Sequence, residues 1–338
     1  MDLTKIKKIF IVLLVLTISL TLSACFDNGI DSGIEDASLS GRLVVKNDEK
    51  IENEAGLIVL EKDSKEVARK YNDYEEEIFQ FKNLNTKEEY TLNIYKLGSE
   101  KYTKSIVLNK GQNDLGNIQL ELEKVKKDEK DGVFIFEINT EYSPMQKENV
   151  RKALAYSINK KEISDIAENF LDNPEENRRY ITEKANRITP QGLIVNDGSN
   201  NMNLEQNISK ADSLLEQNYT IKINHVGGEF YELIVNSIKK DIDNIDKLNV
   251  NFNIEKFNSE EYQKAPVSLK VWSSEYKSPL LSYEEFVDLD KEDKSLLNKI
   301  KMNLDSQSKA LEYLDEFESK LIEEGKVIPV YHRASYEE

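Results

Sequence analysis

The residues best suited to binding chemistry lie in one stretch, residues 272–279 (WSSEYKSP). It holds the single tryptophan of the chain, Trp272, three residues before the acid Glu275. An indole face and a carboxylate side by side suit an ammonium group. A strand-like run at residues 268–272 leads into the stretch, so both side chains are expected where a strand opens into a loop. The alternative is a core tryptophan followed by a solvated turn.

Composition sets the broad class of the protein. The chain has 338 residues, 39% hydrophobic and 9% aromatic, which is enough for packed cores in about two domains. The formal net charge is -17, and acids and lysines alternate throughout, which indicates a soluble acidic surface. No lysine or arginine run is long enough to follow a phosphate backbone in the expected mature chain. Nucleic acid is therefore not an expected partner.

The N-terminus carries the most specific pattern. Three lysines precede an apolar run at residues 9–22, and small residues lead to the sole cysteine, Cys25. The run of about 14 residues is short for a bilayer span but typical of a signal-peptide core. The pattern resembles a bacterial lipoprotein signal peptide. This resemblance implies removal of residues 1–24, a diacylglycerol and palmitate anchor on Cys25, and a place on the extracellular face of a Gram-positive-like cell membrane. A buried structural cysteine in an uncleaved anchor is the alternative.

The next part of the chain predicts a tether and an all-β domain. Residues 25–38 are rich in turn formers and acids and are expected to form a flexible tether. Residues 39–122 contain short alternating strands at roughly ten-residue spacing, which predicts a β-sandwich. The expected strands cover residues 41–46, 57–60, 78–81, 90–95, 102–108 and 118–122. The runs SGRLV, FQFKNL and EYTL resemble carboxypeptidase regulatory-like domains of prealbumin type. That resemblance implies a spacer or adhesion module without catalytic groups.

A charged linker at residues 123–132 separates this domain from a second one at residues 133–338. The second domain begins with an alternating strand at residues 133–139 and a helical run from Lys147, in which Val150, Leu154 and Ile158 share one face. The runs EINT (137–140) and NVRKALAYSINK (149–160) resemble the family 5 extracellular solute-binding proteins. These are the oligopeptide- and dipeptide-binding lipoproteins of ABC importers.

Later segments follow the order of that family. A short helix is expected at residues 208–219, then a strand at 220–224, a helix at 229–242 and a strand at 249–257. This βαβ unit predicts two parallel neighbouring strands. The stretch at 272–279 comes next, followed by a long amphipathic helix and a last strand at residues 327–332. The inner face of that helix is expected to contain Ala310, Leu311, Leu314, Phe317 and Leu321.

The resemblance implies a periplasmic-binding-protein-like α/β lobe, and it departs from the family in two ways. Full-length members have two lobes that close on the peptide, and residues from 133 onward match only the second lobe. The chain also stops at Glu338, before the family's return to the first lobe, so no closing cleft is expected within it. In peptide-binding members an aspartate at the position of Glu275 pairs with the ligand's α-amino group. The resemblance therefore implies ligand-binding roles for Glu275, Trp272 and Tyr276.

Other chemistry finds little support in the sequence. The two histidines, His225 and His332, are each expected to end a strand, where a metal ligand or base is the less favoured interpretation. The loop at residues 197–201 lacks the alternating acids of a calcium loop. No nucleophile elbow, phosphate-cradling glycine loop or zinc motif occurs, so neither an enzyme nor a cofactor or metal site is predicted.

The sequence thus predicts a membrane-anchored lipoprotein in which an all-β sandwich precedes a single α/β lobe. The favoured function is non-catalytic binding of peptides or a similar solute, with an ABC permease as a possible partner. The alternative is a structural or interaction protein whose former ligand face docks a partner protein, for example one that supplies the missing lobe.

Overall fold

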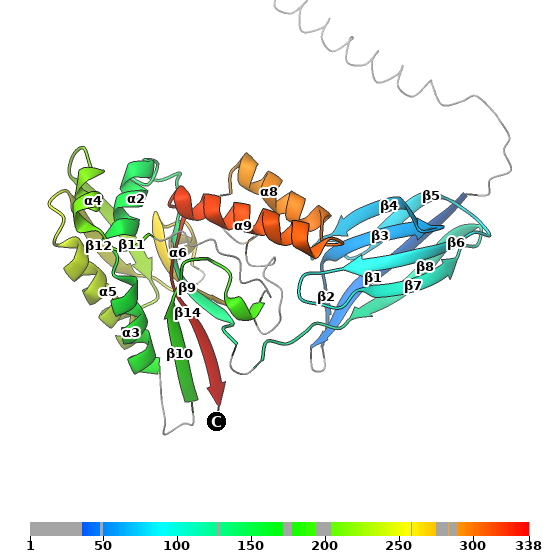
Figure 1. The fold of residues 1–338 in the computed structure, drawn as a ribbon, viewed down its shortest axis with the longest axis horizontal. Coiled ribbons are helices and arrows are strands. Elements are labelled where there is room, and N and C mark those ends of the chain that lie inside the picture. The colour runs from blue at the N-terminus through cyan, green and yellow to red at the C-terminus, as the bar shows by residue number, and fades with distance from the viewer. Residues whose placement is uncertain are drawn as a thin grey trace, which may run out of the picture.

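The computed structural model describes residues 36–47, 50–126, 129–171, 178–193, 204–257, 259–274, 283 and 289–337. Two bodies are visible in Figure 1, a two-sheet segment (residues 36–120) and an α/β segment (residues 132–337). Cys25, Glu275, Tyr276 and the loop at residues 197–201 lie outside the described residues. Within the described ranges, no helix is both long enough and apolar enough to cross a bilayer.

The two-sheet segment consists of two four-stranded sheets that share one apolar core. In one sheet β1 pairs with β2 and β5 in antiparallel fashion and with β8 in parallel fashion, and the other sheet has the order β4-β3-β6-β7. Leu39, Phe79 and Leu92 are among the core side chains contributed by the two sheets. The strands are β1 (Asp36–Asn47), β2 (Lys50–Asn53), β3 (Gly56–Lys62), β4 (Lys65–Asn72), β5 (Phe79–Asn85), β6 (Glu89–Tyr95), β7 (Tyr102–Val107) and β8 (Gly111–Leu120).

Strand β3 differs from its neighbours because it is apolar on both faces. Ile58 and Leu60 enter the core between the two sheets, whereas Leu57 and Val59 face away from it and join a second cluster. Because successive side chains of a strand point to opposite faces, a continuous apolar run requires burial on both sides. The outer face of β3 must therefore be covered by another part of the molecule.

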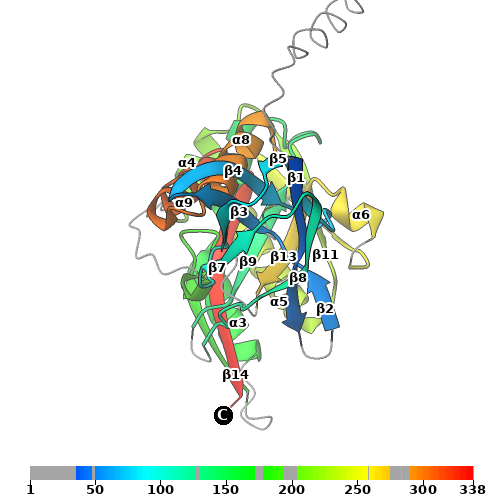
Figure 2. The same cartoon turned by 90° about the vertical axis from the view of Figure 1, so that its right-hand side faces the viewer.

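The α/β segment is built on a mixed six-stranded sheet of order β10-β14-β9-β13-β11-β12. Strands β14, β9, β13 and β11 of this sheet are labelled in Figure 2. The expected βαβ unit is confirmed, since β11 and β12 are parallel neighbours in register from Tyr219 opposite Leu248 to His225 opposite Ile254. Its strands are β9 (Gly132–Ile138), β10 (Arg178–Lys184), β11 (Tyr219–His225), β12 (Leu248–Ile254), β13 (Val267–Ser273) and β14 (Val327–Glu337). Its α-helices are α2 (Glu148–Ser157), α3 (Lys160–Leu171), α4 (Ile208–Ser213), α5 (Glu229–Ile242), α6 (Glu260–Gln263), α8 (Lys291–Met302) and α9 (Gln307–Glu323), and a 3₁₀ turn, η2, covers Gln191–Leu193.

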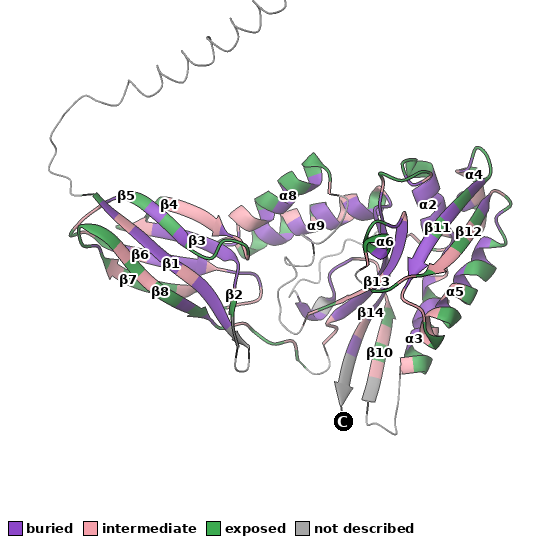
Figure 3. Cartoon of the chain, turned by 180° about the vertical axis from the view of Figure 1, so that it is seen from behind, coloured by how far each residue is buried: buried purple, intermediate pink, exposed green. Residues whose placement is uncertain are grey.

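Helices cover both faces of this sheet. Helices α2, α3 and α5 pack on the face that carries Phe134 and Phe136, and α8 and α9 pack on the face that carries Val133 and Ile135. The side chains of β9 alternate between these two cores, and all of its residues are buried. In Figure 3, exposed residues (green) lie on helices α3 and α5, which cover the sheet. Burial on both faces explains why β9 is almost entirely apolar.

Several expected element boundaries are wrong. The helical run from Lys147 is interrupted at Ile158, which is extended, because the Asn159 side chain accepts the Glu162 N–H at 3.1 Å and begins a new helix, α3. The last strand continues to Glu337, where it pairs with β10, so His332 lies inside it and does not end it. Strands β2, β4 and β10, helices α3, α6 and α8, and the turn η2 were not predicted.

The segments contact one another where α8 and the start of α9 meet β3 and β4. Leu57 and Val59 share an apolar cluster with Leu296 and Ile300 of α8. Polar contacts flank this cluster: Arg69 donates to the Met302 carbonyl oxygen at 2.7 Å and pairs with Asp305 at 2.9 Å, and Lys301 pairs with Asp73 at 3.3 Å and lies over the Tyr71 ring. These contacts cover the outer face of β3.

Candidate functional site

Trp272 lies one residue before the end of β13 and is half-buried. Its ring contacts Tyr283 at a centroid distance of 5.7 Å and a tilt of 48°, and Tyr283 in turn meets Phe317 of α9 edge-on at 5.3 Å. Trp272 belongs to the cluster on the α8–α9 face of the sheet. The indole is therefore neither a fully buried core residue nor a free surface side chain. Part of the ring rests on Tyr283, and part remains accessible to solvent near the end of β13.

The support beneath Trp272 is a buried polar group centred on Glu318. The hydroxyl groups of Tyr283 and Thr189 both contact Oε1 of Glu318, and the Thr189 N–H donates to the same oxygen at 3.0 Å. Tyr283 and Thr189 are fully buried and Glu318 is 3% exposed. Burial raises the pKa of Tyr283 well above its usual value, and the nearby carboxylate of Glu318 adds to the rise. Tyr283 is thus held as a neutral donor to Glu318.

Arg187 balances the charge of Glu318. Its Nε lies 3.3 Å from Oε2 of Glu318, and its terminal nitrogen lies 3.3 Å from Asp315. Burial pulls the pKa of Arg187 down, but the two carboxylates outweigh this and raise it. The Arg187 carbonyl oxygen accepts a hydrogen bond from Nε2 of His332 at 3.0 Å. The buried group therefore connects α9, β14 and the segment after β10.

Backbone hydrogen bonds tie three chain segments together beside Trp272. The Ser274 N–H donates to the Asp131 carbonyl oxygen at 3.0 Å, and the Asp131 N–H donates to the Arg333 carbonyl oxygen at 3.0 Å. These bonds continue the pairing of β13, β9 and β14 past the last regular rung, Ser273–Gly132–Arg333. The edge of the sheet from which Trp272 projects is therefore fixed by main-chain contacts.

Both histidine side chains make contacts within the fold. His225 ends β11 as expected, and its Nδ1 accepts the Gly227 N–H at 3.1 Å, while its ring stacks on Tyr231. Burial lowers the pKa of His332 to about 3, so this imidazole is neutral at physiological pH.

One group of acids in the described part of the chain is close enough to hold a metal, namely Asp290, Asp293 and Glu324. Lysines already stand among these carboxylates. The Lys326 ammonium lies 2.7 Å from both aspartates, and Lys320 lies 2.6 Å from Asp293. Asp290 also caps α8 through the N–H groups of its first turn. This group joins α8 to α9 and β14, and the ammonium groups take the place that a cation would fill.

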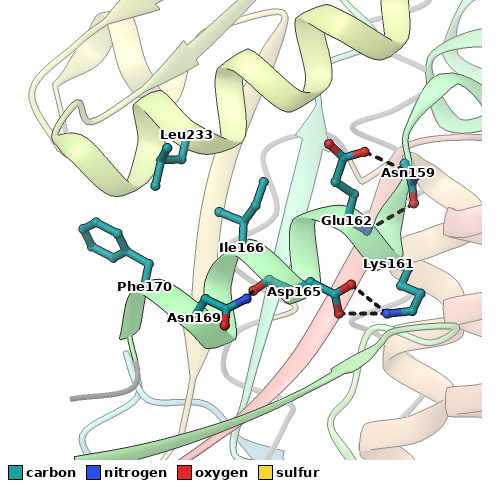
Figure 4. A pocket seen from close by; sticks show the side chains of 8 residues that line it. All are labelled: Asn159, Lys161, Glu162, Asp165, Ile166, Asn169, Phe170 and Leu233. Carbon is teal, nitrogen blue, oxygen red and sulfur yellow. Dashed lines mark hydrogen bonds and ion pairs between the residues drawn. The ribbon is translucent and has the colours of Figure 1, made fainter. Parts of the chain in front are cut away.

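One pocket in the described part of the chain lies away from Trp272. It is a surface groove of about 490 Å³ between α3 and α5, and its apolar wall contains Ile166, Phe170 and Leu233 (Figure 4). A second pocket of about 380 Å³ lies where the two segments meet, with Tyr95 and Leu97 on one side and Leu304 on the other. Neither includes Trp272.

Known structures share the fold of the α/β segment. The murein tripeptide-binding protein MppA of Escherichia coli matches with a TM-score of 0.51 and 13% identity over 61% of this chain and 43% of its own. AppA of Clostridium difficile, described as a putative peptide-binding protein, matches with a TM-score of 0.51 and 13% identity over 62% and 46%. The substrate-binding domain of an oligopeptide ABC transporter of Bacillus anthracis matches with a TM-score of 0.50 and 17% identity over 61% and 45%.

The chain contains the fold of one lobe of such binding proteins. It spans less than half the length of each of these three proteins, and the share of this chain that they cover is about that of the α/β segment. At these identities the similarity concerns the fold alone. No protein-family model matches the sequence, and no curated protein matches it significantly.

Of the three ligand-binding residues expected from the sequence, the structure describes Trp272 alone. The residues that support it were missed, because Thr189, Tyr283 and Glu318 come from distant parts of the chain. One signal was present. Glu318 lies four residues after Leu314 and seven after Leu311, on the face of α9 that was expected to be buried. A carboxylate on an otherwise apolar helix face indicates a buried polar partner.

Proposed function

We propose that this protein is a lipid-anchored extracellular binding protein that recognises peptides, or a similar solute with an ammonium group, at the end of β13. The observation that carries the proposal is the placement of Trp272, half-buried at a fixed strand end and resting on Tyr283. Glu275 follows three residues later and supplies the carboxylate that an ammonium group requires. The likeness in fold to peptide-binding proteins supports this interpretation.

The binding free energy expected from this site alone is too small, so a second binding surface is needed. A cation over an indole contributes about 0.5–2 kcal/mol, and a hydrogen bond to a charged group about 1.5–3 kcal/mol. Together they fall well short of the roughly 8 kcal/mol of micromolar binding. We therefore infer that a partner, an ABC permease or a protein that provides the opposite lobe, completes the site. In this proposal the two-sheet segment is a β-sandwich spacer between the tether and the binding lobe.

Calorimetry of the full-length chain against pooled short peptides tests the binding site. Peptides with a free α-amino group should release heat, whereas the same pool acetylated at the N-terminus should not. Trp272→Ala should weaken the affinity by about twofold to thirtyfold, which corresponds to loss of one cation–π contact. Phe257→Ala is the matched control, since Phe257 is an aromatic residue, 68% exposed, that follows the edge strand β12.

Equal heats with free and acetylated peptides would contradict the ammonium role. Protein docking would be favoured over peptide binding by two results together. No peptide pool would release heat, and the immobilised wild-type chain, but not Trp272→Ala, would recover an envelope protein.

The lipid anchor has an independent test. Cys25→Ser removes the thiol that receives the diacylglycerol group, so the variant should stay unprocessed or leave the membrane fraction. Processing and membrane attachment should be followed by mass spectrometry and fractionation, with Ser23→Ala as a nearby control. Unchanged attachment and cleavage in Cys25→Ser would exclude lipidation at this position.

A further inference from the structure

A buried lysine lines a pocket at the start of α3. Lys160 is 3% exposed, and its Nζ donates one hydrogen bond, to the Ala185 carbonyl oxygen at 3.2 Å. The pocket has a volume of about 330 Å³ and lies between the first turn of α3, the end of β10 and the residues before α4. An ammonium group has three N–H donors, so two of them lack an acceptor among the described residues.

The acids around this pocket are already paired with other lysines. Asp165 pairs with Lys161 at 2.7 Å, a contact drawn in Figure 4, and Glu205 pairs with Lys184. The third acid, Glu183, pairs with Lys130. Among the described residues, Lys160 is the lysine of this pocket with no carboxylate within 4.0 Å. A buried charge without a partner costs free energy, which an anion in the pocket would offset.

The charge balance defines the anion. When each of the three pairs cancels, the ammonium of Lys160 leaves one positive charge. A singly charged anion neutralises it, whereas a doubly charged phosphate would leave negative charge beside Asp165, Glu183 and Glu205. The N-terminus of α3 adds no further anion-binding group to this argument, because the Asn159 side chain already caps its first turn.

We propose that this pocket binds the carboxylate of a small monocarboxylic acid, held by the ammonium group of Lys160. The site lies between α3 and β10, apart from Trp272 on β13, and does not depend on the peptide-binding proposal. Desolvation lowers the pKa of Lys160 to about 8, with a smaller opposing effect of Glu205. A bound carboxylate would stabilise the charged form and raise this pKa.

Acetate and propionate are the probes for this site, with inorganic phosphate at equal ionic strength for comparison. NMR of the full-length chain with labelled lysines should show saturable shifts of the Lys160 side-chain signals. This measurement reads Lys160 in the wild-type chain and is independent of how any variant folds. Calorimetry should then show at least a tenfold loss of acetate affinity in Lys160→Met.

Lys264→Met is the matched control, because Lys264 is exposed, pairs with Glu260 at 2.5 Å and does not line this pocket; the affinity of this variant for acetate should stay within twofold of wild type. Three results would overturn the proposal: no saturable shift at Lys160, unchanged acetate affinity in a folded Lys160→Met, or phosphate binding as tight as acetate binding.

Discussion

The ring of Trp272 rests on Tyr283, and the Tyr283 hydroxyl contacts the Glu318 carboxylate, which the partly buried Arg187 neutralises. Each member of this group satisfies another, which is required because an unpaired buried charge is strongly destabilising. His332 is a buried member of the same group, and its neutral imidazole donates to the Arg187 carbonyl oxygen. Because burial disfavours the charged ring, the folded structure holds His332 in its neutral form.

This gives His332 a defined effect on stability. The unfolded chain protonates the imidazole near the ordinary pKa of about 6.5, whereas the folded chain does so only near a pKa of about 3. The stability that comes from the neutral ring is complete above pH 6.5 and is lost as the pH falls from 6.5 toward 3. Between pH 7.5 and pH 5, His332 should lower the free energy of unfolding by about 2 kcal/mol.

Urea unfolding of wild type and His332→Gln at several pH values checks this effect, since the amide of glutamine does not titrate. The variant should lose about 2 kcal/mol less than wild type over that interval. Parallel curves for the two proteins would show that His332 does not titrate differently in the folded chain.

At the scale of elements, the sequence predicts the helices and strands whose apolar residues recur with one clear helical or strand period. The alternation of β9, the βαβ unit of β11, α5 and β12, and the buried stripe of α9 all follow this rule. The strands that were missed lack such a pattern, whereas helix α8 was missed although Leu296, Leu297 and Ile300 form its buried face. Strand β4 is mostly exposed or half-buried, and the described part of β10 pairs only with β14 at the sheet margin. Pairing with a neighbour, and not apolar content, forms these strands.

The candidate site was predictable at one residue only. Trp272 could be placed because a strand pattern precedes it, and β13 ends one residue later. Its supports could not be placed, since Thr189, Tyr283 and Glu318 meet through tertiary packing across as many as 129 residues. Local periodicity carries no information about contacts at that separation. The acid on the buried face of α9 was the one local sign of the polar group.

At the scale of the whole molecule, the two segments share a core. Leu57 and Val59 of β3 belong to the same cluster as the inner residues of α8 and as Trp272. The two-sheet segment therefore covers one face of the helical layer of the α/β segment, and the polar contacts of Arg69 lie beside this apolar surface. Contacts of this kind favour unfolding as one unit, because exposing the interface costs each segment buried apolar area.

Val59→Asp tests this coupling. Val59 is 2% exposed on the interface side of β3, so the new carboxylate would be buried without a partner, at a cost of about 3–5 kcal/mol. Val59 lies outside the core between the two sheets of β1–β8 and outside the core beneath α2, α3 and α5, so both of these parts should remain folded. One calorimetric transition should become two, and the radius of gyration from X-ray scattering should increase.

Val67→Asp on the neighbouring strand β4, where the valine is 47% exposed, should leave both measurements unchanged. A single transition and an unchanged radius in Val59→Asp would mean that the apolar cluster does not hold the segments together and that the polar contacts of Arg69 and Lys301 suffice.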